Sequence, residues 1–163
     1  MKLVISILIT GTVATAIVDL WGIARRTMLG TSLPNYGMVG RWFAHMPRGR
    51  LRHSAIANTP SVGGERAIGW VAHYLIGVAF AAMLIGICGS AWIDQPALLP
   101  ALAIGIATVT APFLLMQPCM GAGIAASRMP DPSAARRQSL VTHTIFGFGL
   151  YAGGWVAHAL SAL

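Results

Sequence analysis

The sequence predicts an all-α fold, a polytopic membrane four-helix bundle, from three observations. The chain of 163 residues is 56% hydrophobic and only 9% charged, with a mean hydropathy of +0.70, outside the range of ordinary water-soluble domains. Several long apolar stretches reach the length of about 20 residues that a hydrocarbon core of about 30 Å requires. All but one of the 11 Lys and Arg residues fall into two segments, 25–66 and 128–137, between those stretches. We therefore expect one integral membrane domain, 1–163.

The four membrane helices are expected at about 3–26, 65–88, 97–118 and 132–162. The first begins with features of a cleavable signal peptide, because Lys2 and an apolar run precede Ala14-Thr15-Ala16. Apolar sequence continues well past these small residues, and Arg25-Arg26 then opposes translocation of the connection after the helix. This pattern favours an uncleaved first helix.

The first connection contains a short amphipathic helix, at about residues 36–46. Asn35 stands at the position of a helix cap, and Pro47 would stop the helix about three turns later. Apolar side chains recur between them at helical spacing, at Met38, Val39, Trp42, Phe43 and Met46. We expect this helix to lie in the membrane interface.

A basic turn comes after the interfacial helix. Arg48, Arg50 and Arg52, together with Arg41 on the helix itself, are candidates for contact with anionic headgroups or phosphate. Two interpretations remain open: the arginines contact lipid headgroups, or they bind a phosphorylated or lipid-linked substrate. The sequence has no phosphate-binding loop, dinucleotide fingerprint or paired-cysteine motif.

The charge pattern also predicts orientation. The positive-inside rule places both Arg-rich connections in the cytoplasm and both termini in the periplasm of a multi-pass protein of the bacterial inner membrane. Because the arginines lie near membrane ends, anionic lipids at the cytoplasmic face account for the net charge of +7, and we expect no nucleic-acid partner. Cys88 and Cys119 fall near opposite faces, so they should not form a disulfide, which needs Cα atoms within about 7 Å.

Two of the expected helices share a short pattern. Residues 69–77 and 139–147 both read small-x3-His-x3-Gly, with His73 and His143 at the centre. A duplication would make the chain two parallel two-helix repeats, related by an axis along the membrane normal. Small residues four apart also have a structural use, because they let helix backbones approach closely.

Several polar residues fall in the cytoplasmic third of the membrane when depth is counted at about 1.5 Å per residue. They come from four helices and are Asp19, His73, Gln117, Cys119 and His143. Ionisable groups at that depth are costly unless they face a partner, the bundle interior or a water-filled cavity. The histidines and Asp19 have a structural interpretation as well. A His ring could be bonded to a backbone carbonyl, and Asp19 could form a helix-to-helix bond or a pair with Arg25. Their shared depth predicts an intramembrane polar site.

The third helix supports such a site. Pro112 and Pro118 each remove a backbone donor, and Gly121 and Gly123 come immediately after them. We expect the inner end of this helix to be kinked or unwound. Exposed carbonyls at membrane depth are tolerated where protein or a water-filled cavity receives them, so residues 116–123 are a candidate cavity wall.

The chain resembles an uncharacterised bacterial inner-membrane family, a domain of unknown function of about 160 residues with four predicted transmembrane helices. The resemblance rests on Asp19-Leu-Trp and on the segments 40–50, 64–74 and 116–127. It implies about four helices in the inner membrane. It carries no known activity, so no functional residue is transferred from it.

Three functions fit these observations. The preferred one is a small carrier or channel-like protein, a homo-oligomer, in which Asp19 and the two histidines exchange a proton or bind a cation. The second is a haem- or metal-binding membrane protein, with His73 and His143 as axial ligands or, together with Asp19 or Cys119, as ligands of a transition metal. The third is a non-catalytic scaffold or assembly factor. An enzyme is not expected, and we assign no catalytic residue and no cofactor.

Overall fold

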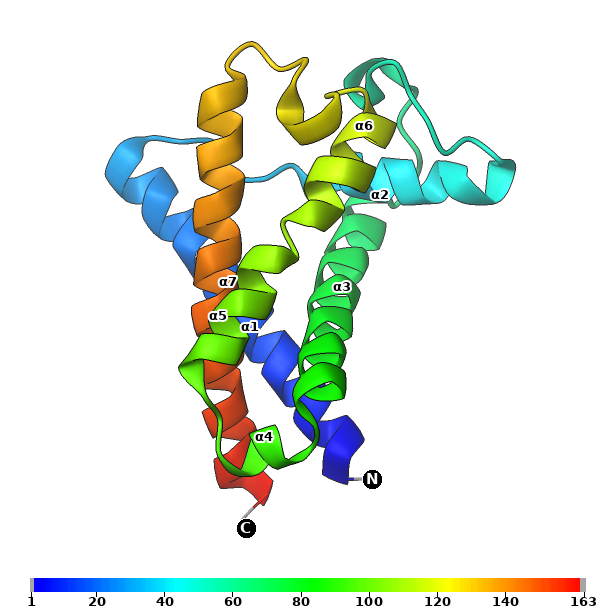
Figure 1. The fold of residues 1–163 in the computed structure, drawn as a ribbon. Coiled ribbons are helices and arrows are strands. Elements are labelled where there is room, and N and C mark those ends of the chain that lie inside the picture. Colours follow the sequence, from blue (N-terminus) through cyan, green and yellow to red (C-terminus); the bar gives the residue numbers. More distant parts are fainter. Residues whose placement is uncertain (1, 162–163) are drawn as a thin grey trace. The chain divides into compact units, whose positions relative to one another are not determined.

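A computed structural model describes residues 2–161, which contain helices and turns and no strand (Figure 1). The helices are α1 (Lys2–Leu29), α2 (Tyr36–His45), α3 (Glu65–Cys88), α4 (Ala91–Asp94), α5 (Leu98–Ala107), α6 (Gln117–Met120) and α7 (Pro132–Ser161). Short turns stand between them, at η1 (Met46–Arg48), η2 (Ile56–Asn58), η3 (Pro112–Met116) and η4 (Ile124–Ala126). The all-α prediction is confirmed. The expected end of the last helix at 162 lies outside the described residues, as do both ends of the expected domain 1–163.

Three helical segments are long and apolar enough to cross a membrane. They are Lys2–Leu29, Glu65–Cys88 and the run Leu98–Met120, which joins α5, η3 and α6. α7 has 30 residues but is not among them, because its arginines, histidines, glycines and threonines lower its hydropathy. The fourth crossing, over α7, therefore stays a prediction.

The third apolar segment is not a continuous α-helix. A π-helical turn occupies Pro112–Met116, and the backbone N–H of Gln117 donates to the carbonyl of Pro112, five residues earlier. α6 then ends at Gly121, whose φ of 96° is left-handed. Proline removes the usual donor and glycine permits the left-handed end. The expected break in this segment is confirmed, and its form as a π-helical turn was not predicted.

The described chain forms two compact units, each built from several segments. The first comprises the described part of residues 1–33, 74–108 and 141–163, and the second comprises residues 34–73 and 109–140. α3 and α7 therefore contribute residues to both units.

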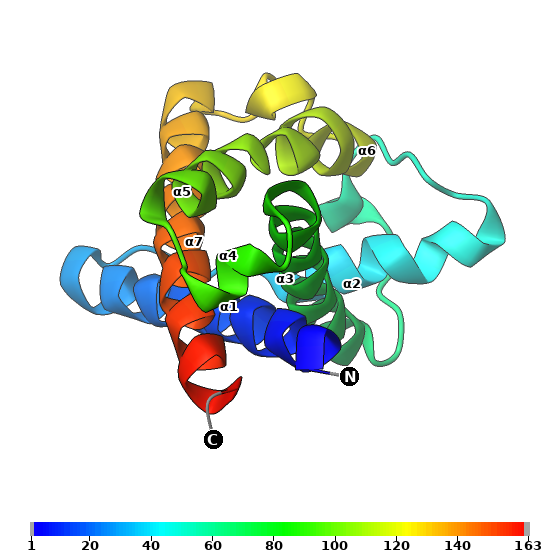
Figure 2. The same cartoon turned by 60° about the horizontal axis from the view of Figure 1, so that its bottom comes forward.

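In the first unit the helices meet at glycines. A Cβ on Gly11 of α1 would lie 2.5 Å from the Cα of Val78 on α3, and one on Gly105 of α5 would overlap Gly147 of α7. α5 runs beside α7 in both ribbon views (Figure 2). A buried apolar cluster fills the unit, with Ala14, Val18, Ala81, Leu84, Ile85, Trp92, Ile93, Ala101, Phe146 and Leu150. Small residues let the backbones of these helix pairs approach closely, which is the structural use that the sequence pattern indicated.

Large apolar side chains also cover the outside of the first unit. Leu20, Leu75, Ile87 and Leu99 are each more than 60% exposed. A water-soluble surface rarely carries so many large apolar groups together, whereas a surface that faces lipid does. This distribution fits the three apolar segments.

In the second unit α2 packs against the first turns of α3. Gly40 lies against the carbonyl of Glu65, and Gly69 lies against the carbonyl of Tyr36, both too closely for a Cβ. Trp42 of α2 donates from its indole nitrogen to the Leu51 carbonyl at 2.9 Å. The loop after α2 is therefore folded back onto this helix.

Candidate functional site

Asp19 lies inside α1, in a segment apolar enough to cross a membrane. The hydroxyl of Tyr74, on α3, donates to Oδ2 of Asp19 at 2.9 Å. Both residues belong to the first unit. A carboxylate in an apolar helix is costly without a partner. The hydroxyl of Tyr74 gives the Asp19 carboxylate such a partner. Tyr74 was not among the predicted site residues.

His143 occupies a second polar position in the same unit. Its Nδ1 is 2.9 Å from the Thr108 hydroxyl oxygen and 3.3 Å from the Gly105 carbonyl. The Thr108 hydroxyl itself donates to Gly105 at 2.6 Å. A hydroxyl has one hydrogen, so in the neutral ring Nδ1 carries the hydrogen and Nε2 is the acceptor. The tautomer of His143 is thus set by the end of α5.

His73 belongs to the second unit, with Tyr36 as its neighbour. The Tyr36 hydroxyl and Nε2 of His73 share a hydrogen bond of 3.0 Å. The two rings stack with centroids 4.3 Å apart, and Trp70 packs against Tyr36 at 4.5 Å. The two histidines of the sequence repeat therefore have different kinds of partner.

Gln117 and Cys119 also lie in the second unit, at the broken end of the third apolar segment. The side-chain oxygen of Gln117 is buried without a hydrogen-bond partner in the described part of the chain. Cys119 is half-buried with a free thiol, and its carbonyl accepts from the backbone N–H of His53 at 2.8 Å. Of the five predicted polar residues, Asp19 and His143 thus share one unit, and His73, Gln117 and Cys119 share the other.

Metal ligation was one interpretation of these residues. Within residues 2–161, no group of three or more His, Cys, Asp or Glu side chains is arranged to hold a metal ion. His73 and His143 each have a ring nitrogen engaged by a neighbouring side chain.

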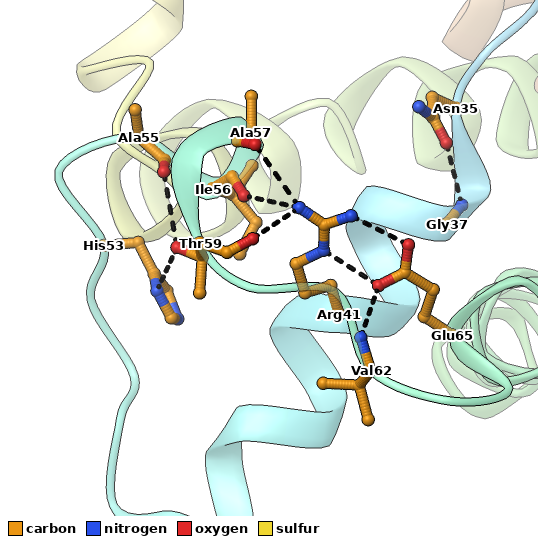
Figure 3. A network of polar contacts seen from close by, with 10 residues as sticks. All are labelled: Asn35, Gly37, Arg41, His53, Ala55, Ile56, Ala57, Thr59, Val62 and Glu65. Atoms are coloured by element: carbon orange, nitrogen blue, oxygen red, sulfur yellow. Dashed lines mark hydrogen bonds and ion pairs between the residues drawn. The ribbon is translucent and has the colours of Figure 1, made fainter.

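Arg41 lies at the centre of a polar network in the second unit (Figure 3). Its guanidinium donates to both carboxylate oxygens of Glu65 at 2.8 Å. It also donates to the carbonyls of Ile56 at 3.2 Å and Thr59 at 2.7 Å. The carboxylate of Glu65 raises the pKa of Arg41 above its ordinary value. In this network Arg41 holds the loop 56–65 on α2, and its predicted contact with headgroups or phosphate stays a prediction.

The other three predicted arginines are exposed. Arg48 is the last residue of η1, Arg50 comes two residues later, and Arg52 borders a cavity of about 480 Å³ that Arg128 also lines. Sequence reasoning did not pair Arg52 with Arg128. The available signal was that both lie in connections expected on the same side of the membrane.

His53 was predicted as part of the basic turn, but the burial of His45 and His53 was not predicted. His45 at the end of α2 is 5% exposed, and neither of its ring nitrogens has a hydrogen-bond partner in the described chain. Its ring lies 5.3 Å from that of His53, edge to face. His45 falls off the apolar stripe of α2, and this position gave no reason to expect burial.

A family described as a protein of unknown function, DUF2938, matches residues 7–157. The chain belongs to this family. The match includes every candidate residue from Asp19 to His143, and it confirms the resemblance to an uncharacterised family. DUF2938 carries no assigned activity, so the chemistry must be inferred from the residues themselves. No curated protein and no solved structure matches the chain.

Proposed function

We propose that this protein is a small carrier of the bacterial inner membrane that exchanges a proton or a cation at Asp19. The observation that carries the proposal is the hydrogen bond of 2.9 Å between Tyr74 and a carboxylate inside an apolar helix. Intramembrane carboxylates are rare, and in pumps and transporters they serve as proton or ion sites.

Two further features support this function. His143 and Thr108 provide a second polar position in the same unit. The third apolar segment is interrupted by a π-helical turn at Pro112–Met116, and such interruptions recur at functional sites and in the broken helices of transporters. In the proposed orientation the Arg-rich connections face the cytoplasm and both termini face the periplasm.

The test is proton flux into liposomes that contain the purified protein, driven by a pH gradient and reported by a trapped dye. We expect Asp19→Asn to abolish flux, because the amide cannot exchange a proton, and Tyr74→Phe to alter its pH dependence. Asp94→Asn is the matched control, since Asp94 is exposed in the short helix α4.

The same variants separate a carrier from a scaffold. A purely structural bond between Tyr74 and Asp19 predicts that Asp19→Asn lowers the thermal stability and changes no flux. Proton flux that is equal in wild type, Asp19→Asn and empty liposomes would refute proton exchange at Asp19, and equal cation flux in the same three samples would refute the carrier function.

A further inference from the structure

Two cavities in the second unit share one lining residue, Arg128. The first, of about 480 Å³, is bordered by polar groups, among them Arg52, His53 and Ser127. The second, of about 610 Å³, is mostly apolar. Both volumes fall in the range of about 300–1,000 Å³ typical of small-molecule sites. Neither cavity uses Asp19, Tyr74 or His143.

The polar cavity has the chemistry of an anion site. The residues that line it include Arg52 and Arg128, which have guanidinium groups, and Ser54 and Ser127, which have hydroxyls. No Asp or Glu is among the described residues that line it. Arginine is suited to phosphate because its planar fork of donors matches two phosphate oxygens at once.

His53 adds an unpaired buried group to this wall. The residue is 9% exposed, and its Nδ1 lies 3.2 Å from the Thr59 hydroxyl. Its Nε2 has no hydrogen-bond partner in the described chain. The Thr59 hydroxyl donates to the Ala55 carbonyl at 3.3 Å, so in the neutral ring Nδ1 carries the hydrogen and Nε2 is an unused acceptor.

Backbone contacts fix the two walls of the polar cavity against each other. The N–H of His53 donates to the Cys119 carbonyl at 2.8 Å. Gly121 lies so close to the Ser54 carbonyl that any Cβ would overlap it. On the other wall the N–H of Arg128 donates to the Ala122 carbonyl at 2.9 Å. The positions of Arg52 and Arg128 are therefore set by a folded loop pair.

The apolar cavity is suited to a hydrocarbon chain. Methionines from three segments line it, namely Met38, Met116, Met120 and Met129. Methionine side chains are flexible and polarizable, so they adapt to chains of variable shape. Arg128 lines both cavities. Its positive charge is therefore placed where the hydrocarbon chain of a lipid would join the lipid headgroup.

We propose that the two cavities bind one phosphate-bearing anionic lipid, with the phosphate between Arg52 and Arg128 and an acyl chain along the methionines. The loop before Arg52 is the one expected at the cytoplasmic membrane surface, where such lipids are concentrated. The lipid site and the Asp19 site share no residue, so each can fail without the other.

The test is calorimetric titration of the detergent-purified protein with three probes: dihexanoyl phosphatidylglycerol, dihexanoyl phosphatidylcholine and inorganic phosphate. We expect the anionic lipid to bind at least about tenfold more tightly than either other probe, because only it offers both charge and chain. Arg52→Ala and Arg128→Ala should each weaken its binding about tenfold, the loss of a charge-assisted hydrogen bond. Both side chains are exposed, so neither substitution opens the core.

Two further variants complete the design. Arg137→Ala removes the same charge from an exposed position that borders neither cavity, and it should leave the affinity unchanged. Ala135→Phe narrows the apolar cavity and should weaken lipid binding while leaving phosphate binding unchanged.

Several results would overturn the proposal. Equal affinity for phosphatidylcholine would exclude recognition of the anionic headgroup. Phosphate binding as tight as lipid binding would identify the free ion as the ligand. If Arg137→Ala weakened lipid binding as much as Arg52→Ala and Arg128→Ala do, the loss of affinity would come from net charge and not from the cavity.

Discussion

Replacing Gly11 by alanine tests the helix packing of the first unit. A Cβ at this position would lie 2.5 Å from the Cα and 2.8 Å from the nitrogen of Val78 on α3, and 2.9 Å from the carbonyl oxygen of Gly77. Ordinary van der Waals contacts of a Cβ lie at 3.4–4 Å. The opposing atoms belong to the backbone of α3, so no side-chain rotation relieves the overlap and the two helices must separate.

The expected change in stability is the balance of two opposing effects. Overpacking of this kind costs about 1–3 kcal/mol, and alanine gains about 1 kcal/mol over glycine in helix propensity. Because backbone atoms collide, we expect a cost in the upper half of that range and a net loss of about 1–2 kcal/mol.

Gly86→Ala is the matched control on the same helix pair. No heavy atom lies within 4 Å of a Cβ at Gly86, so the same change should stabilise the protein by about 0.5–1 kcal/mol. The assay is reversible unfolding in mixed micelles, followed by helical circular dichroism. The two variants should move the unfolding midpoint in opposite directions. A Gly11→Ala protein as stable as Gly86→Ala would refute the close approach of α1 and α3.

Three other predictions address topology, cofactors and the cap of α7. A cysteine introduced at the exposed Leu51 of a variant without Cys88 and Cys119 should react with an impermeant reagent only from the cytoplasmic side; labelling from the periplasm would reverse the orientation. The purified protein should show no Soret band, because Tyr36 occupies the Nε2 atom of His73 that an axial ligand would need; a band lost in His73→Ala would contradict this. Bonds from Ala134 and Ser133 lower the pKa of Asp131, so its contribution to stability is present above the ordinary carboxyl value and is lost as pH falls through the lowered value. Acid unfolding that is identical in Asp131→Asn would exclude this contribution.

The helix positions were largely predictable from sequence, because length and hydropathy alone define them. Glu65 and Cys88 are the observed ends of α3, as expected. The break in the third segment was predictable from Pro112 and the glycines after Pro118, since proline lacks a donor. Its π-helical form depends on the hydrogen bond from Gln117 to Pro112, which no residue pattern specifies.

The polar residues were easier to predict than their partners. Asp19 is conspicuous in an apolar run, but its bond to Tyr74 joins residues 55 positions apart. That pairing depends on how α1 and α3 are rotated against each other, which contacts such as that of Gly11 with Val78 determine. Arg41 was a candidate for contact with anionic headgroups or phosphate because of its charge, and its bidentate bond to Glu65 appears only when the loop is folded.

The most direct measurement for the carrier function is infrared difference spectroscopy of the protein in lipid across the pH range over which flux changes. If Asp19 exchanges a proton, acidification should produce the carbonyl band of a protonated carboxyl group. That band should be absent in Asp19→Asn, present in Asp94→Asn and shifted in Tyr74→Phe, which removes the hydrogen bond to Asp19. A band that persists unchanged in Asp19→Asn, or none in wild type while flux varies, would contradict proton exchange at this residue.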